Sequence, residues 1–291
     1  MPVDRKAFIE LPGTPALLQR LDRIVRSRSV GTLVGPQSAG KSRLLDYWKN
    51  GGSTIVQAHE VLLVDIWRPE RASLGDSKIA TPIACITFSQ LWDALDSPML
   101  RSPLNHKSVH RWRPERLYTD YQFLSLFRHV HATLRRQQVR AIIIDNAGYL
   151  DRYTLERLMA LRDRHHPQSA LILCAQMRPN EAPDEPLDGL LYSVAEANVG
   201  CTDKLVLSLI TVEEFSDVLA NLIKKNLYAD VRPNELGELL FVRWGERVQG
   251  NWQHLDRVAT LLDEELGPEV GQARRVLNQA VYEKVEARLS W

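Results

Sequence analysis

Short, almost continuously apolar runs alternate with amphipathic segments along the first two thirds of the chain. The apolar runs predict buried strands at 30–34, 61–66, 141–145, 170–175 and 204–210. Apolar residues at helical spacing predict helices at 15–28, 41–48, 88–95, 118–138, 154–164 and 190–197. Near-continuous Val, Leu and Ile runs are typical of strands that are covered on both faces. The pattern therefore predicts an α/β fold with a parallel sheet.

After Thr211 the strand pattern stops. Helical patterns follow at about 212–227, 233–243, 251–266 and 271–289, and Thr211 with Glu214 fits a capping box that opens the first of them. We therefore predict three parts: an N-terminal lead and helix (1–29), an α/β core (30–210) and a small all-α domain (211–291).

Composition narrows the class of protein. The 291 residues are 44% hydrophobic and 25% charged, as in an ordinary soluble globular protein. The formal net charge of +1 argues against a uniformly basic nucleic-acid coat but permits a local basic surface. The three cysteines lack metal-type spacing. With no secretory signal pattern and no apolar run near the ~18 residues of a membrane helix, we expect a cytoplasmic protein that does not bind membranes.

One glycine-rich stretch fits the phosphate-binding pattern G-x-x-x-x-G-K-[ST]; it reads Gly35, Pro36, Gln37, Ser38, Ala39, Gly40, Lys41, Ser42. The glycines allow consecutive backbone N–H groups to point at a phosphate. Lys41 is expected to reach the β/γ oxygens, and the Ser42 hydroxyl to ligate Mg²⁺. A strand before the loop and a helix after it complete an anion site. The alternative is a glycine loop that binds nothing.

Polar residues at the ends of two predicted strands extend this site. Asp145 ends the strand 141–145, where an acid can hold the water shell of a metal, so Ser42 and Asp145 form the predicted Mg²⁺ site. Gln176 follows the strand 170–175, which is expected beside the loop in a parallel sheet with the usual strand order. It is a candidate sensor of the γ-phosphate, or a loop residue without a role.

With this loop, the Asp145 strand, Gln176 and a helical region containing Gly250 and Asn251, the chain resembles AAA+ ATPases over about residues 15–289. It is most similar to transposition regulators of the TnsC/TniB/MuB kind, near the replication-initiator clade. The reasons are its size, its small lid, and Ile-Ile-Ile-Asp-Asn-Ala followed by a helix containing Leu150. The resemblance implies an AAA+ P-loop domain with a parallel sheet, followed by a C-terminal helical lid.

The resemblance also implies an activity. Such proteins bind ATP between adjacent subunits and polymerise as homo-oligomers around double-stranded DNA. They mark a target site and work with a transposase and target-selection proteins.

Three departures from the family pattern predict slow or weak ATP hydrolysis. Asn146 stands where AAA+ ATPases usually carry a Glu that polarises the attacking water; an amide cannot accept a proton, although it can orient a water. Gln253 stands where many relatives place an Arg that touches the γ-phosphate. Residues 179–203 contain no Arg or Lys, although an initiator-type arginine finger would lie there. Other candidates for the finger are Arg152, Arg157, Arg162 and Arg164.

A proline-containing insertion at about 67–117 carries the best candidate for DNA contact. Within residues 101–116 there is a single acid, Glu115, against five basic residues: Arg101, Lys107, Arg111, Arg113 and Arg116. Such residues neutralise phosphates, and in AAA+ DNA filaments loops between the second and third core strands face the central channel. The alternative is a solvated insertion without DNA.

Two other functions stay open. One is an AAA+ replication initiator or helicase loader, which shares the core. The other is a DNA-independent signalling or defence switch that is gated by nucleotide.

Overall fold

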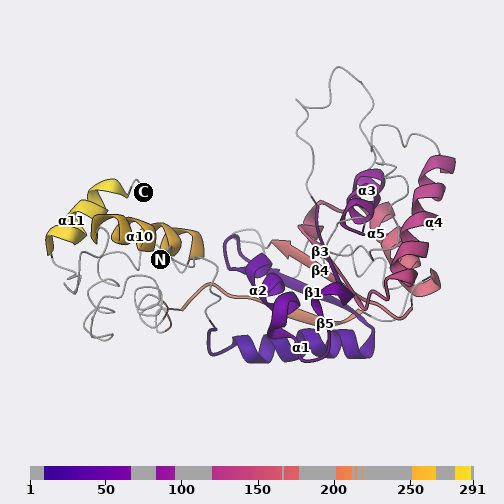
Figure 1. Ribbon diagram of the computed structural model, residues 1–291, viewed down its shortest axis with the longest axis horizontal. Helices are drawn as coiled ribbons and strands as arrows, with labels where there is room; N and C mark the ends of the chain where they lie inside the picture. Colours follow the sequence, from indigo (N-terminus) through magenta and orange to yellow (C-terminus); the bar gives the residue numbers. More distant parts are fainter. Residues whose placement is uncertain are drawn as a thin grey trace, which may run out of the picture. The chain divides into compact units, whose positions relative to one another are not determined.

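The computed structural model describes residues 10–66, 83–95, 120–165, 167–176, 201–211, 214, 218, 251–266 and 279–289. The chain divides into two compact units (Figure 1). The sheet unit comprises Ala16–Val34 and Leu45–Val206, and the loop unit comprises Met1–Pro15, Gly35–Leu44 and Leu207–Trp291. The predicted domain boundaries stay a prediction. Outside the described residues lie the predicted helices at 190–197 and 233–243, most of 212–227, and the candidate DNA-binding residues Arg101, Lys107, Arg111, Arg113 and Arg116.

Five strands form the sheet, in the order β2-β3-β4-β1-β5. Their bounds are β1 Val30–Gly35, β2 Val61–Asp65, β3 Ala141–Asp145, β4 Ala170–Gln176 and β5 Cys201–Val206. The β1–β5, β2–β3 and β3–β4 pairs are parallel, which confirms the predicted α/β class. The prediction of 204–210 for the fifth strand is wrong. The pairing of β5 with β1 ends at Val34↔Val206, just before β1 enters the glycine loop.

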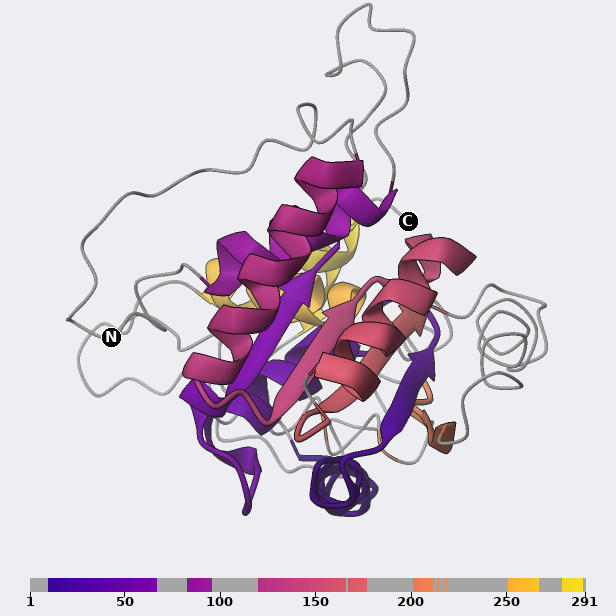
Figure 2. The same cartoon turned by 90° about the vertical axis from the view of Figure 1, so that its right-hand side faces the viewer.

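Alternate residues of each strand face opposite sides of the sheet. Ile142 and Ile144 of β3 belong to an apolar core cluster, together with residues of α3 (Ile83–Leu95), α4 (Asp120–Arg136) and α5 (Arg152–Ala160). Figure 2 shows these three helices on one side of the sheet. Ala141, Ile143 and Asp145 alternate with them and therefore face the other side.

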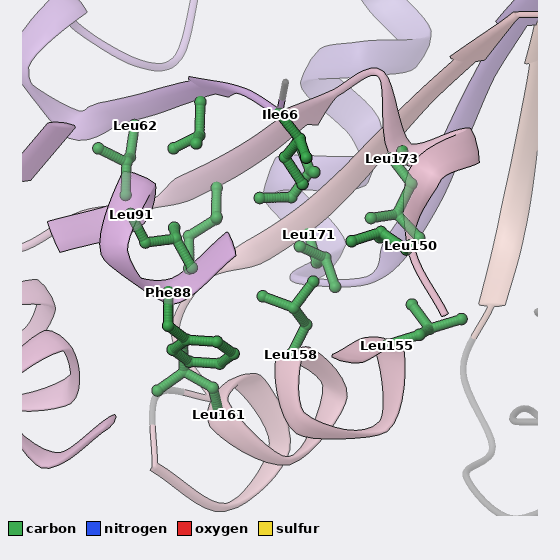
Figure 3. Packing of buried hydrophobic residues seen from close by; sticks show 14 of the residues in the cluster. Leu62, Ile66, Phe88, Leu91, Leu150, Leu155, Leu158, Leu161, Leu171 and Leu173 are labelled. Carbon is green, nitrogen blue, oxygen red and sulfur yellow. The ribbon is translucent and has the colours of Figure 1, made fainter. Parts of the chain in front are cut away.

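Phe88 of α3 belongs to this cluster and is fully buried. In Figure 3 it lies close to Leu158 and Leu161 and below the sheet residue Leu171. Its ring makes an edge-to-face contact with Phe123 at 5.3 Å between centroids and a tilted contact with Phe127 at 5.4 Å. Such pairs contribute about 0.5–1.5 kcal/mol each beyond the area they bury. These contacts join α3 to α4.

The opposite face of the sheet is covered by α1 (Thr14–Ser27). Its apolar stripe, including Leu21 and Ile24, is fully buried. A Cβ atom at Gly31 of β1 would lie 2.3 Å from Cδ1 of Ile24, so a residue without a side chain lets helix and strand approach closely. This helix agrees with the predicted 15–28.

The remaining helices begin and end near their predicted bounds. The helix α2 (Lys41–Tyr47) continues into a π-helical turn, Trp48–Gly52, and a short 3₁₀ turn, Ala58–Glu60, precedes β2. The predicted helix at 154–164 is α5 plus a π-helical turn, Leu161–His165. The short pattern at 88–95 is the second half of α3.

A buried carboxylate joins α1 to the turn after α2. Asp22 accepts hydrogen bonds from Trp48 Nε1 (2.8 Å), Ser53 Oγ (2.7 Å) and both Thr54 N (3.1 Å) and Thr54 Oγ1 (2.7 Å). Burial alone would raise the pKa of Asp22, but the hydrogen bonds from Ser53, Thr54 and Trp48 outweigh it and hold the pKa below its ordinary value.

We expect Asp22→Asn to lower the free energy of unfolding by about 1.5–3 kcal/mol at neutral pH, because a charged acceptor of several hydrogen bonds is lost. A lowered folded-state pKa means that the contribution is present above the unfolded value of about 3.9 and is lost as pH falls through the lower folded value. The difference between variant and wild type in urea unfolding should therefore shrink below about pH 4. A difference independent of pH would contradict this assignment.

The loop unit contains α10 (Trp252–Leu266) and α11 (Gln279–Arg288). Arg288 pairs with Glu264 (2.6 Å) and Glu265 (2.9 Å), which joins the two helices. The predicted capping box is confirmed, since Thr211 N donates to Glu214 Oε2 (3.0 Å) and Glu214 N to Thr211 Oγ1 (3.2 Å). In the described part of the chain, no helix combines the length and the apolar character needed to cross a membrane.

Candidate functional site

The glycine loop between β1 and α2 adopts backbone conformations that few residue types allow. Gly40 has φ 89° and Ser38 has φ 58°, and Ala39 N donates to Pro36 O (3.3 Å). Glycine occupies positive φ without steric cost. When right-handed and left-handed backbone conformations alternate in such a loop, successive N–H groups point toward one side. This arrangement can bind an anion.

The Lys41 ammonium group lies on the loop itself. Its Nζ donates to Gly35 O (2.8 Å) and to Pro36 O (2.6 Å). Neutral carbonyl groups are weaker acceptors than an anion, so phosphate oxygens can replace them as stronger, charge-assisted partners. The cation is therefore already held where the loop backbone surrounds it.

Gly35 allows the loop to leave β1 beside another backbone segment. A Cβ atom at this position would lie 2.3 Å from the carbonyl oxygen of Leu207. Because the obstacle is backbone rather than a flexible side chain, the first glycine of the motif is required by packing as well as by the loop's turn.

The N-terminus of α10 contacts the loop within the same unit. Asn251 caps the helix, its Oδ1 accepting from Gln253 N (2.9 Å) and His254 N (3.4 Å). Trp252 N donates to Ser38 O (3.3 Å), and Ser38 Oγ donates to Gln253 Oε1 (3.4 Å). The predicted site residue Gln253 thus lies beside the loop.

An open hollow adjoins the loop. Its lining is mainly apolar and includes Leu11, Thr14, Ala39, Arg43, Leu207 and Trp252. The Trp252 indole also lies 3.3 Å from where a Cβ of Gly40 would stand. Apolar walls with an aromatic side chain and a few polar groups suit a flat organic ring. The sequence pattern does not predict Trp252, Leu11 or Leu207 as site residues, because they come from segments far apart in the chain.

In the sheet unit, polar residues gather at the carboxyl ends of the strands. Asp145 is 6% exposed and its Oδ1 accepts from Asn146 N (2.9 Å). Its own carbonyl oxygen accepts from Ile66 N (3.2 Å), which ties β3 to the end of β2. The carboxylate is therefore held in place at the end of β3.

Asn146 turns the chain sharply at the end of β3. It adopts the left-handed conformation (φ 57°, ψ 33°), which asparagine tolerates better than most residues. Its Nδ2 donates to Asp65 Oδ1 (2.7 Å), and Asp65 pairs with Asp145 in the β2–β3 register. Sequence reasoning missed Asp65; the signal was an acid at the end of an apolar run.

Gln176 is the exposed last residue of β4. This strand lies between β3 and β1, in agreement with the strand-order argument, and β1 continues into the glycine loop. Ile144 pairs with Leu173, so alternation puts Gln176 on the same face of the sheet as Asp145. The carboxyl ends of parallel strands are where α/β sheets bind ligands.

The candidate finger arginines make local contacts in the sheet unit. Arg152 pairs with Glu156 (2.9 Å) in an exposed i,i+4 bridge, the Arg157 guanidinium lies 4.8 Å from the centroid of the Tyr153 ring, and Arg162 contacts Asp163. For Arg164 the structure describes no side chain.

The similarity of this chain to known proteins lies in its fold. No protein family matches the sequence, and no curated protein matches it. The Walker-type ATPase PABY2304 of Pyrococcus abyssi is 14% identical with a TM-score of 0.58, over 99% of this chain and 73% of that one. The ORC2 protein of Aeropyrum pernix is 12% identical with a TM-score of 0.65, over 98% and 70%. PCH-2 of C. elegans is 12% identical with a TM-score of 0.53, over 99% and 71%.

The chain therefore has the mixed α/β fold of AAA+ P-loop ATPases, with a five-stranded parallel sheet and a C-terminal helical region. At these identities the likeness is one of fold. What the site does is argued from its residues.

Proposed function

We propose that the chain is an ATP-binding AAA+ ATPase whose glycine loop, Gly35–Ser42, holds the phosphates. The observation that carries this proposal is the Lys41 ammonium fixed on the loop by two carbonyl groups, at 2.8 and 2.6 Å. The apolar hollow of the same unit offers Trp252 and Leu207 to the base. The ORC2 protein of Aeropyrum pernix was solved as ADPNP–ADP complexes, so a protein of this fold binds such nucleotides.

The residues present fit Mg²⁺ as the accompanying metal. Ser42 and Asp145 carry oxygen donors, which this hard cation prefers. In the described part of the chain, no three His, Cys, Asp or Glu side chains group as a metal site, and Mg²⁺ usually combines one or two protein ligands with phosphate oxygens and waters. When bound, the ion would neutralise charge on the phosphates.

Hydrolysis is proposed to be slow. Asn146 offers an amide where a proton acceptor is expected, and Gln253 offers an uncharged group beside the loop. Arg152, Arg157 and Arg162 already have partners on or near their own helix. A missing arginine finger alone lowers phosphoryl transfer by about 10³–10⁵. We expect turnover below about 1 s⁻¹.

For the biological role we propose a DNA-binding regulator of transposition that assembles as a homo-oligomer on double-stranded DNA and recruits a transposase, with target-selection proteins as further partners. The basic residues of the insertion, from Arg101 to Arg116, support DNA contact. A second candidate is an initiator-type AAA+ protein, which the fold similarity to the ORC2 protein favours.

Electron microscopy of negatively stained protein with ATP, with and without duplex DNA, tests this role. We expect rings or filaments that form only with both. A variant with charge reversal at Lys107, Arg111 and Arg113 should assemble far less on DNA at low salt. Assembly that ignores DNA would contradict the proposal and favour a nucleotide-gated signalling or defence switch.

We also propose a cytoplasmic location. Cys85 and Cys174 are buried thiols that form no disulfide in the described part of the chain, and burial raises the pKa of the Cys85 thiol. Buried thiols outside disulfides suit a reducing compartment.

A further inference from the structure

The solvent face of α4 carries arginine side chains and, after the first residue of the helix, no acid. Arg128, Arg135 and Arg136 are exposed. On the other side of the helix, Leu126 and Leu134 are fully buried in the core of the sheet unit. The buried stripe fixes the rotation of the helix, so the three guanidinium groups face solvent. Figure 2 shows α4 on the same side of the sheet as α3 and α5.

Within the described chain, no carboxylate pairs with Arg128, Arg135 or Arg136. Acids that follow in the chain are used by other arginines. Glu156 of α5 pairs with Arg152 at 2.9 Å, and Asp163 contacts Arg162. The positive charge on this face of α4 is therefore not neutralised by an ion pair.

The helix dipole accounts for only part of this charge. Arg135 and Arg136 lie in the last turn of α4, where a cation stabilises the helix end. Arg128 lies two turns earlier, and the effect of the dipole falls off within the last turn. Because seven residues separate Arg128 from Arg135, their side chains lie along one line, about 10 Å apart on the helix axis.

Such a line of positive charge is complementary to the backbone of a nucleic acid. A DNA duplex carries one negative charge per about 1.7 Å of its axis. Protein–DNA interfaces are strongly positive, whereas the centres of protein–protein interfaces are depleted of charged residues. Among the described residues of α4, Leu124 is the only large apolar side chain that is exposed. The apolar stripe that a membrane-surface helix would need is buried in the core.

The basic insertion leads directly into α4. Four positions separate Arg116, the last basic residue of the insertion, from Asp120, the first residue of the helix. Four residues of extended chain span at most about 14 Å. A duplex that contacts Arg116 is therefore close to the beginning of α4, and both segments belong to the sheet unit.

We propose that α4 binds the phosphate backbone of double-stranded DNA through Arg128 and Arg135, as a helical continuation of the basic insertion. This inference rests on the proposed DNA-binding role and extends it to a second surface. Each guanidinium group donates charge-assisted hydrogen bonds to phosphate oxygens and displaces condensed counterions from the duplex. Contacts of this kind position the duplex and do not read its sequence.

The double variant Arg128→Ala/Arg135→Ala tests the proposal, with Arg23→Ala/Arg26→Ala as the matched control. Arg23 and Arg26 are also exposed on a helix, but α1 covers the opposite face of the sheet. Anisotropy of a fluorescein-labelled duplex, titrated with the full chain and ATP at several salt concentrations, measures binding. The α4 variant should bind about 10–100 times more weakly at about 50 mM salt. Its slope of log K against log salt should be less steep by about 1.8, the value for two lost phosphate contacts. The control should match the wild type in both.

The outcomes separate this proposal from the role on which it rests. Equal urea midpoints for the two double variants and the wild type show that all three fold alike. An unchanged salt slope for the α4 variant overturns the inference, as does an equal loss of affinity in the control, which would be a general effect of net charge. If charge reversal at Lys107, Arg111 and Arg113 weakens binding while the α4 variant binds normally, the inference falls and the proposed role stands. A wild type that binds no duplex overturns the proposed role itself. Binding of poly-L-glutamate in place of duplex through the same arginines would assign the face to an acidic protein and also overturn the inference.

Discussion

We expect Lys41→Ala to bind ATP about a hundredfold more weakly than the wild type, because it removes a charged donor whose strong hydrogen bonds contribute about 1.5–3 kcal/mol each. In the structure this ammonium group already donates hydrogen bonds to the carbonyl groups of Gly35 and Pro36. Binding of ATP would exchange those neutral acceptors for phosphate oxygens. Titration with a fluorescent ATP analogue measures the loss.

Lys49→Ala is the control for this experiment. Lys49 lies in the π-helical turn after α2, outside the glycine loop. We expect its ATP affinity to equal that of the wild type. If Lys41→Ala binds as tightly as Lys49→Ala, the loop is not the phosphate site and the proposed function is wrong.

Gly35→Ala is the second large effect, and it acts on folding as well as on binding. The new Cβ would stand 2.3 Å from the carbonyl oxygen of Leu207, so the backbone of one segment must move. Overpacking of this kind costs about 1–3 kcal/mol and more where backbone is the obstacle. Because Gly35 begins the glycine loop, we expect weaker ATP binding even where the protein still folds.

Gly148→Ala is the matched control, since a Cβ at Gly148 meets no atom within 4 Å. Urea unfolding followed by circular dichroism should show a lower midpoint for Gly35→Ala and an unchanged one for Gly148→Ala. Equal midpoints would mean that the close approach of Leu207 to the loop is not part of the folded protein.

Local pattern predicts the strands well where burial decides the conformation. The run Ala141–Asp145 is buried along its whole length, and its predicted and observed bounds agree residue for residue. The predicted fifth strand is displaced, because its bounds depend on the length of β1 rather than on its own hydrophobicity. The end of β1 at the glycine loop leaves residues 207–210 unpaired with it.

The candidate site also contains residues that the sequence predicts and residues that only the fold brings together. The loop motif and Asp145 are contiguous signals, so their chemistry follows from residue type and spacing. Asp65 carries no motif of its own, and its link to Asn146 depends on the neighbouring β2–β3 register. The apolar hollow likewise combines Leu11, Leu207 and Trp252, which are distant in the chain.

The amino-acid sequence by itself determined the α/β class, the glycine loop and the acid at the end of β3, because each depends on short-range periodicity or on a contiguous motif. Only the tertiary structure decided which strands are neighbours, and therefore which carboxylate meets the amide of Asn146. Strand pairing brings Asn146 to Asp65, 81 positions away in the chain, and no local pattern encodes which partner strand the backbone hydrogen bonds select.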